Sequence, residues 1–354
     1  MSARRPPTGV PRVSPLRRLM VGGTAAAATI GFIVLLLLAW GLWTYHGPGP
    51  EAKAGKATIV QLRPGSGVNE IASILETAGA VRSAPVFAAA AQLTGAARSL
   101  KAGEYEIPSR TSMAGVLRKL REGAVVRHFV TIPEGVTAEM TVDILMANPI
   151  LVGGAPVPPE GAILPETYEV TRGEDRASVL ARMMDARDKL LVQLWAQRSP
   201  GLPYNTPEEA VILASIVEKE TAKPEERPMI ARVFVNRLQS GMRLQSDPTI
   251  IYGISRGKPL GRGIRQSELL GPTPYNTYAV DGLPPTPIAN PGRESLAAAV
   301  APPPGDQLYF VADGTGGHAF ASTLEEHERN VARWREIERR RAGEMLPAPK
   351  AKAR

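Results

Sequence analysis

The sequence predicts an α+β protein with a single N-terminal transmembrane helix, a small α+β subdomain and a larger mixed α/β domain. Three observations carry this prediction: an uncharged apolar stretch near the N-terminus, strand patterns that alternate with amphipathic helical patterns after residue 57, and a high content of Pro (33) and Gly (34) among 354 residues. Such a Pro and Gly content is typical of a loop-rich fold. The 44% hydrophobic content and the length suit two or three compact domains. We expect a basic tail (1–18), a transmembrane helix (19–45), a linker (46–56), the small subdomain with a connecting strand and helix (57–150), the larger domain (151–335) and a basic, disordered tail (336–354).

The apolar stretch runs from Leu19 to Tyr45 without a charged residue and contains IGFIVLLLLAWGLW. At about 1.5 Å per helical residue it can cross roughly 30 Å of hydrocarbon. A cleaved signal peptide is the alternative, but its apolar region is shorter, and no small-x-small site follows Trp43 directly. Five arginines and no acidic residue precede the stretch. The positive-inside rule therefore predicts one membrane pass, with residues 1–18 in the cytoplasm and everything after residue 46 outside it.

The charge distribution argues against nucleic-acid binding. The net charge is +8, but residues 1–18 contribute +5 and residues 329–354, with nine basic and three acidic residues, contribute +6, which leaves −3 for the middle of the chain. Basic charge in two tails is not the clustered patch of a nucleic-acid-binding domain. The chain has no cysteine, which excludes disulfides and thiolate chemistry. Its four histidines lack metal-ligand spacing, so we expect no metal and no cofactor.

The small subdomain is predicted from ATIVQL as a strand (57–62), two apolar helical segments, a second strand in GEYEIP, and a helix capped by Thr111 or Ser112 that stops at Gly123. A Pro/Gly-rich connection follows at 153–170, and a charged amphipathic helix begins at Arg176.

The stretch ILASIVEKET ends a helix predicted over 207–221, whose capping box is formed by Thr206 and Glu209. The helix is apolar nearly all round, so at least one of Glu218 and Glu220 should be desolvated, and desolvation raises the pKa of a carboxyl group toward the range of a general acid. Both could instead be solvated or paired with a nearby Lys or Arg. Periodicity does not choose between the two glutamates, although the more apolar stripe lies under Glu220.

Polar loops follow the next helix, which stops at Gly241. They comprise Gln245, Ser246 and Asp247, then TPYNTY (273–278), GLPPTPIANPG (282–292) and LYFVADGTGGHAF (308–320). Amide, hydroxyl and aromatic groups of this kind suit a groove for a neutral carbohydrate. The same segments could be plain turns, with Tyr275 and Tyr278 in the core. GTGGH lacks the nucleotide-binding context, and no G-x-S-x-G motif is present.

Several of these segments together resemble one family. ASIVEKET, VFVNRL, GMRLQSDPTIIYG, TPYNTY, GLPPTPIANPG and LYFVADGTGGHAF, in this order, are similar to the YceG-like (MltG) family of endolytic murein transglycosylases, as is the N-terminal anchor. The resemblance covers roughly residues 57–335. LKAGEYEIPSRTSMAGVLRKLREG resembles the LysM-like subdomain of that family, and EGAILPETYEV carries Ile163 and Leu164 where the family has Leu and Phe.

The resemblance implies cleavage of the β-1,4 bond between N-acetylmuramic acid and N-acetylglucosamine in nascent peptidoglycan strands, with formation of 1,6-anhydro ends. It implies that the catalytic glutamate is the first of VEKET, Glu218, acting as general acid and then base, and that 151–335 is the catalytic domain. Residues expected to bind substrate or support the site are Glu220, Asn236, Arg237, Gln245, Ser246, Asp247, Tyr275, Asn276, Thr277, Tyr278 and Asn290. Implied partners are peptidoglycan glycan strands, the bilayer through 19–45 and peptidoglycan synthases, including penicillin-binding proteins. The implied location is the bacterial inner membrane, with the catalytic domain in the periplasm or outside the cell.

Two alternative functions are also compatible with the sequence. A membrane-anchored scaffold could bind peptidoglycan through the LysM-like subdomain without catalysis. A hydrolytic muramidase could use Asp247 as a second carboxylate and would leave a reducing end instead of an anhydro end.

Overall fold

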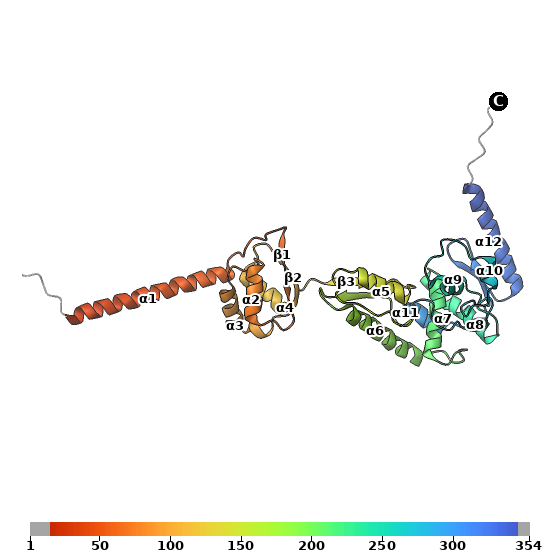
Figure 1. Ribbon diagram of the computed structural model, residues 1–354, viewed down its shortest axis with the longest axis horizontal. Helices are drawn as coiled ribbons and strands as arrows, with labels where there is room; N and C mark the ends of the chain where they lie inside the picture. Colours follow the sequence, from red (N-terminus) through yellow and green to blue (C-terminus); the bar gives the residue numbers. More distant parts are fainter. Residues whose placement is uncertain (1–14, 346–354) are drawn as a thin grey trace, which may run out of the picture. The chain divides into compact units, whose positions relative to one another are not determined.

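The computed structural model describes the backbone of residues 15–345 and the side chains of residues 28–341. The predicted basic tails fall partly outside the described residues, at 1–14 and 346–354. The chain divides after Arg127 into two compact units (Figure 1). The first contains α1 (Pro15–His46), β1 (Ala57–Leu62), α2 (Val68–Thr77), α3 (Ala84–Leu93), η1 (Ala96–Arg98), β2 (Gly103–Pro108) and α4 (Met113–Glu122). The second contains β3 (His128–Thr131), α5 (Ala138–Ala147), β4 (Thr167–Val170), α6 (Arg176–Ala196), α7 (Pro207–Glu220), η2 (Pro224–Glu226), α8 (Arg227–Gln239), α9 (Asp247–Ser255), α10 (Gln266–Leu270), α11 (Arg293–Val300), β5 (Tyr309–Ala312), β6 (His318–Ala321) and α12 (Leu324–Met345).

Helix α1 contains the predicted apolar stretch. Its segment Ala28–His46 is long and apolar enough to cross a membrane, by length and composition, and only 6% of its most apolar window is buried inside the protein. A helix that exposes Leu, Ile and Phe on all sides is stable where lipid surrounds it. The structure is therefore consistent with a single membrane anchor.

The first unit is a two-stranded antiparallel sheet covered by three short helices. β1 pairs with β2 in a register from Ala57 opposite Pro108 to Leu62 opposite Gly103. Phe87, Tyr105 and Leu120 are among the fully buried side chains that α3, β2 and α4 contribute to one core. The predicted order of strand, two helices, strand and helix is present.

The segment predicted as a linker, 46–56, is folded onto this unit. The amide of Gly49 donates to the carbonyl of Arg110 at 3.1 Å, and the amide of Arg110 donates to the carbonyl of Pro50 at 2.9 Å. A Cβ atom on Gly49 would lie 2.0 Å from the carbonyl oxygen of Thr111, so only glycine allows this approach. Because Pro and Gly are common in both flexible linkers and tight contacts, composition alone did not reveal the docking.

The boundary between the two units differs from the sequence expectation. Residues 128–150 were expected with the small subdomain, but β3 pairs with β4, and α5 packs against α6. Leu145 and Met183 are fully buried in the same cluster. The Arg176 guanidinium ties the ends of α5 and α6 together by donating to the carbonyls of Leu145, Met146, Asn148 and Gly153. Because of these long-range contacts, residues 128–150 belong to the second unit although they follow the first unit directly in the sequence.

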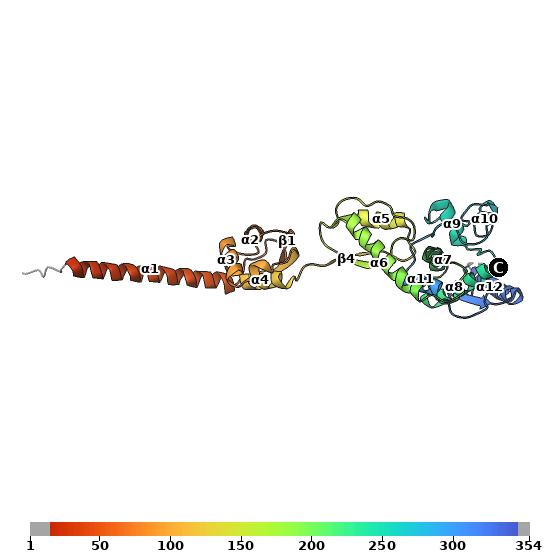
Figure 2. The same cartoon turned by 90° about the horizontal axis from the view of Figure 1, so that it is seen from below.

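Helix α7 lies at the centre of the larger helical part, with α6, α8, α9 and α11 packed around it (Figure 2). The predicted capping box is present: the Thr206 hydroxyl accepts from the Glu209 amide at 3.2 Å, and the Glu209 carboxylate accepts from the Thr206 amide at 3.1 Å. Leu213 and Ile216 are fully buried. A buried and firmly capped helix gives the residues at its C-terminal end a fixed position.

Helix α12 is longer than expected, because residues 336–345 continue it instead of belonging to a disordered tail. Ile337 packs beside Gly314, which has a φ of +87°. Arg341 donates to the carbonyl of Gly314 and lies 5.9 Å from the ring of Trp334. These contacts with the β5–β6 hairpin support a helix end whose composition alone indicates fraying.

We predict that Leu145→Ala destabilises the second unit by about 3 kcal/mol, the range for emptying a fully buried leucine site. The matched variant Leu120→Ala should destabilise only the first unit. Calorimetry of the full chain in detergent, which follows the two unfolding transitions, measures both effects. A shift of the first unit's transition by Leu145→Ala would place residues 128–150 with the small subdomain.

Candidate active site

A polar hollow of 290 Å³ lies in the second unit where several of its segments meet. Its lining residues come from the end of α7, from α8, from the turn that leads into α9 and the first residue of α9, from the loop between α10 and α11, from β5 and from α12. They are Glu220, Arg237, Gln245, Asp247, Tyr278, Phe310 and His327. Five of these seven belong to the residues expected from the sequence.

Glu220 is the buried acid of this hollow. Its carboxyl group lies deep among protein atoms, yet the residue keeps partial access to solvent through the hollow. Burial raises the pKa of Glu220 to about 7, and the negative charge of Asp247 adds to the rise. The Ser246 hydroxyl donates to Glu220 Oε1 at 2.5 Å, which lowers the pKa in part. A carboxyl group with a pKa near 7 keeps its proton in a large share of molecules at neutral pH.

Asp247 and Tyr278 form a second polar pair in the hollow. The Tyr278 hydroxyl donates to Asp247 Oδ1 at 2.7 Å. Burial first, and then this bond to a carboxylate, raise the pKa of Tyr278. The hydroxyl therefore stays protonated and remains a donor near Glu220.

The turn that carries Gln245 has a strained backbone. Gln245 has a φ of +53°, in the left-handed region that non-glycine residues rarely adopt. Its amide donates to the carbonyl of Thr277 at 3.0 Å, and the amide of Ser246 donates to the Thr277 hydroxyl at 2.9 Å. Thr277 is fully buried. Its contribution to the site is therefore to hold the turn that presents Gln245 and Asp247 to the hollow.

Arg237 and Asn236 fasten the β5 segment to α8. Arg237 Nε donates to the carbonyl of Leu308 at 2.7 Å, and its NH1 donates to the carbonyl of Leu244 at 2.6 Å. The Asn236 side-chain amide donates to the carbonyl of Gln307 at 2.9 Å. Arg237 thus borders the hollow with a guanidinium that is already engaged, and Asn236 has a structural position.

Three further expected residues lie outside the hollow. The Asn276 amide donates to three carbonyls at the end of α10, those of Glu268, Leu269 and Gly271. The hydroxyl of Tyr275 pairs with that of Thr286 at 2.8 Å. Asn290 is fully buried, accepts from the amide of Ile163 at 3.2 Å and donates to the carbonyl of Val136 at 3.0 Å. Their side chains hold loops together.

Glu218 points away from the hollow. Residues i and i+2 of a helix are about 200° apart, so Glu218 and Glu220 face opposite sides of α7. Glu218 Oε1 pairs with Arg227 NH2 at 3.0 Å, and its Oε2 accepts from the amide of Gly292 at 2.9 Å and the hydroxyl of Ser295 at 2.7 Å. Both carboxylate oxygens are therefore occupied inside the protein.

The same Arg227 collects two more carboxylates. It pairs with Glu134 at 2.7 Å and with Glu294 at 3.0 Å, while its own side chain is only 7% exposed. Glu134 precedes α5, and Glu294 belongs to α11. The network around Arg227 thus joins α7, α8 and α11 to the turn before α5.

The sequence profile of the YceG-like family matches residues 60–333. The chain belongs to this family. It is 32% identical to the endolytic murein transglycosylase of Streptococcus pneumoniae over 332 residues, which cover 80% of this chain and 59% of that protein. It is 28% identical to the endolytic murein transglycosylase of Bacillus subtilis over 313 residues, 79% of this chain and 86% of that protein. The chain thus spans about three fifths of the length of the S. pneumoniae relative. The crystal structure of a YceG-like protein from Listeria monocytogenes is 28% identical, with a TM-score of 0.49 over 78% of this chain and 99% of that one.

The hollow of this YceG-like protein also contains Phe310, which belongs to the segment 308–320 expected to line a groove but was not singled out, and His327, which sequence reasoning missed. The His327 ring stacks on Tyr309, with centroids 5.1 Å apart. Burial first, and then the charge of Arg237, lower the pKa of His327. Its buried Nδ1 has no hydrogen-bond partner within the described chain. The sequence signal that could have pointed to His327 is helical spacing: His327, Val331 and Trp334 lie at i, i+4 and i+7 and therefore share one face of α12.

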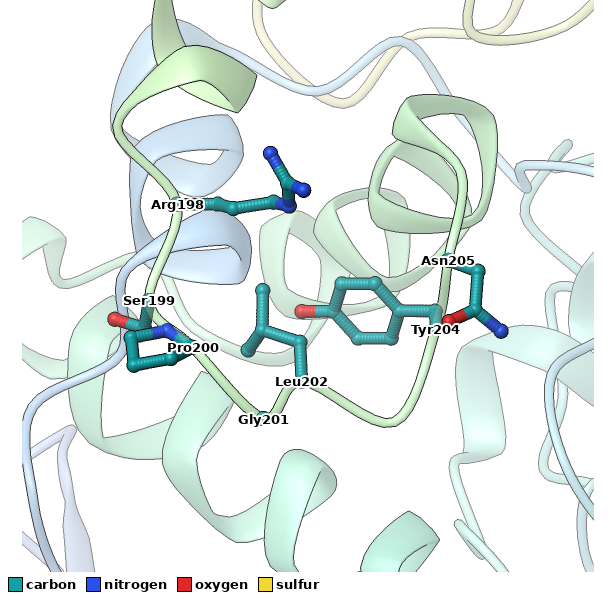
Figure 3. Close-up of a pocket in the computed structure, with 7 residues that line it drawn as sticks. All are labelled: Arg198, Ser199, Pro200, Gly201, Leu202, Tyr204 and Asn205. Atoms are coloured by element: carbon teal, nitrogen blue, oxygen red, sulfur yellow. The ribbon is translucent and has the colours of Figure 1, made fainter.

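A larger hollow of 520 Å³ lies at the loop between α6 and α7 (Figure 3). It is lined by Arg198, Ser199, Pro200, Gly201, Leu202, Tyr204 and Asn205, none of which is a carboxylic acid. The Tyr204 hydroxyl already donates to the carbonyl of Ala299, and Arg198 lies over the Trp195 ring at 4.6 Å. Size alone therefore does not make it the candidate site. Among the residues that the structure describes, no group of three or more His, Asp or Glu could hold a metal ion.

We predict that Glu220→Gln stabilises the protein above pH 7. The pKa of Glu220 rises from an ordinary 4.5 to about 7 on folding. The folded state therefore binds the extra proton between these values, and the wild type loses stability as pH rises through this window, by up to about 3 kcal/mol. Glutamine carries no such charge. Urea unfolding at several pH values should show a wild-type–variant difference that grows from pH 4 to pH 8, whereas a constant difference would contradict the raised pKa.

Glu218→Gln is expected to destabilise the protein, in contrast to Glu220→Gln. This change removes one charge of a buried ion pair and leaves Arg227 with Glu134 and Glu294, whose side chains are 40% and 61% exposed. We predict a loss of about 2 kcal/mol, because breaking a buried pair leaves the remaining charge poorly compensated. The same urea series measures it. A variant as stable as the wild type would show that the network contributes little.

Proposed function

We propose that this protein is a membrane-anchored endolytic lytic transglycosylase of peptidoglycan, with Glu220 as its general acid and then base. The observation that carries the proposal is one buried carboxyl group with a pKa of about 7 that faces a polar hollow. The curated relatives from S. pneumoniae and B. subtilis, both named endolytic murein transglycosylase, support the reaction class.

Glu220 takes the role that resemblance alone implied for Glu218. A general acid must donate a proton to a substrate, so it needs a protonated form and access to the substrate. Glu218 is paired with Arg227, and both of its oxygens are engaged by groups of the protein. Glu220 has one protein hydrogen bond, from Ser246, and lines the hollow. We therefore assign Glu218 a positioning role at the end of α7.

In the proposed reaction, Glu220 donates its proton to the glycosidic oxygen as the bond from that oxygen to the anomeric carbon of N-acetylmuramic acid breaks. The oxygen leaves as the 4-hydroxyl of N-acetylglucosamine, and positive charge develops at the anomeric carbon. The Glu220 carboxylate then accepts the proton of the muramoyl 6-hydroxyl, whose oxygen bonds to the anomeric carbon. A 1,6-anhydro end results, Glu220 is protonated again, and no water is consumed.

Neighbouring groups have complementary roles in this proposal. The Asp247 charge keeps the pKa of Glu220 high and would stabilise positive charge at the anomeric carbon. The Gln245 amide and the Tyr278 hydroxyl can bind sugar hydroxyl or N-acetyl groups, and Phe310 offers an apolar face.

A hydrolytic muramidase is the second candidate, because Asp247 lines the same hollow as Glu220. Retaining glycosidases use a nucleophilic carboxylate about 5 Å from the acid. The bond from Tyr278 to Asp247 favours the first candidate, because a hydrogen-bonded carboxylate is a weaker nucleophile.

The setting of the site is part of the same proposal. Helix α1 would anchor the protein once in the bacterial inner membrane, with its arginine-rich N-terminus in the cytoplasm and both compact units on the other side. The first unit would act as a LysM-like module for glycan. Proposed partners are peptidoglycan synthases, including penicillin-binding proteins, which supply strands at the membrane.

We predict that the full chain in detergent cleaves uncrosslinked glycan strands to internal fragments with 1,6-anhydro ends, seen by mass spectrometry. Glu220→Gln should lower the rate by about 10³-fold or more, since it removes the proposed general acid. Glu218→Gln should keep a measurable rate. If the products have reducing ends and these vanish in Asp247→Asn, the protein is a hydrolytic muramidase. If wild type and Glu220→Gln are equally active, Glu220 is not the general acid. If neither the wild type nor any variant cleaves glycan, a non-catalytic scaffold is favoured.

The pH profile should report Glu220 directly. With a pKa of about 7, kcat/KM should fall as pH rises above 7, because the general acid loses its proton. Asp247→Asn removes a neighbouring negative charge, which lowers the pKa of Glu220, so the fall should begin at lower pH. An unchanged profile would show that a different group is the acid.

A further inference from the structure

An apolar groove runs between α1 and α3 in the first unit. It encloses 280 Å³ and is lined by Leu38, Leu42 and Tyr45 on α1 and by Val86, Ala90 and Leu93 on α3, among others. The floor and walls carry no charged residue. We call this hollow the α1–α3 groove.

Helix α3 has an unusual composition for a surface helix. In APVFAAAAQL only Gln92 is polar. One side of the helix is buried in the core through Phe87 and Ala91. The other side, with Val86, Ala90 and Leu93 at i, i+4 and i+7, lines the groove, and Leu93 is 89% exposed. A helix that faces water normally carries polar residues on its exposed side. Exposure of this apolar side of α3 to water is therefore unfavourable.

The α1 wall of the groove belongs to the proposed membrane span. Residues 37–45 form the last turns of Ala28–His46, the segment that is long and apolar enough to cross a membrane. Leu38 and Leu42 are 57% and 61% exposed. If α1 spans the bilayer, lipid surrounds these side chains, and α3, on the other wall, meets the same lipid.

Residues at this end of α1 mark a membrane–water boundary. Trp40 and Trp43 are more than half exposed, and such aromatic residues gather at the interface between hydrocarbon and water. Arg82, just before α3, lies 5.4 Å over the Trp43 ring and donates to the carbonyl of Pro48 at 3.2 Å. The start of α3 is thereby tied to the interfacial end of α1.

The position of α3 beside the span is fixed by the folded segment after α1. The amide of Gly47 donates to the carbonyl of Trp43 at 2.7 Å at the end of α1, and the amide of Gly49 donates to the carbonyl of Arg110 in the first unit, which we call the small module. The module therefore does not swing freely on a linker. If α1 is inserted in a bilayer, α3 is therefore held at a fixed depth, at the bilayer surface.

We propose that acyl chains of membrane lipid fill the α1–α3 groove, so that α3 is a second, interfacial contact of the small module with the bilayer. This inference rests on the proposed membrane anchor and adds to it a lipid-facing surface outside the span. Apolar faces of interfacial helices enter roughly 5–10 Å into the boundary between headgroups and acyl chains. The module would then lie on the membrane from which nascent strands emerge.

The test uses the absence of cysteine from the chain. Single cysteines replace Leu93 (groove), Leu36 (span) and Ile59 (β1, 64% exposed, outside the groove) in the full chain. Each variant is labelled with bimane and reconstituted in vesicles that contain phosphatidylcholine spin-labelled near the headgroup end of the acyl chain. We expect quenching at Leu93→Cys about three-fold stronger than at Ile59→Cys, because only the groove meets acyl chains.

Strong quenching at Leu36→Cys with none at Leu93→Cys would overturn the groove proposal and leave the anchor intact. Absence of quenching at both positions would overturn the anchor and the groove together. A bimane emission at position 93 that shifts to the blue without lipid quenching would show that protein, a second copy or another chain, covers the groove, and this also overturns the proposal. Glycan cleavage by the same variants reports the proposed activity separately.

Discussion

The ion pair between Glu218 and Arg227 is the interaction on which the site depends. It joins the last turn of α7 to the first residue of α8, and Arg227 extends the connection to Glu134 before α5 and Glu294 on α11. With Glu218 fixed on one side of α7, the helix cannot rotate at its end, and Glu220 must face the opposite side. The direction of the proposed acid is thus set by a carboxylate that does not itself enter the hollow.

Glu218 and Glu220 are chemically identical side chains whose surroundings give them different properties. Glu218 is buried but has a guanidinium, an amide and a hydroxyl as partners, so its charge is compensated. Glu220 has one hydroxyl and a carboxylate neighbour, and burial therefore raises its pKa. Ionisation of Glu220 therefore costs stability, whereas the Glu218 carboxylate is buried with its partners. A strained φ at Gln245 adds a further local cost at the same hollow, as is common where function and stability compete.

Much of the fold follows from local signals in the sequence, but the different surroundings of Glu218 and Glu220 do not. The capping box of α7, the apolar length of α1 and the strand–helix order of the first unit are all properties of neighbouring residues, and the structure contains them. Spacing also requires that Glu218 and Glu220 face opposite ways. Which of them meets Arg227 depends on how α8 turns back after η2, a tertiary contact that no periodicity encodes. The same reason hid the structural roles of Asn276 and Asn290, because an amide that satisfies distant backbone carbonyls resembles, in sequence, an amide that binds sugar.

The folded segment after α1 restricts how the first unit can move relative to the proposed anchor. A flexible linker would let the small module sample many heights above the bilayer, whereas hydrogen bonds from Gly49 to Arg110 and from Arg110 to Pro50 hold it at the end of the span. If the first unit binds glycan beside a membrane, as proposed, this attachment restricts it to strands close to the lipid. In the proposed setting, proximity to the membrane would favour nascent strands over mature wall as ligands of the first unit, independently of the hollow around Glu220.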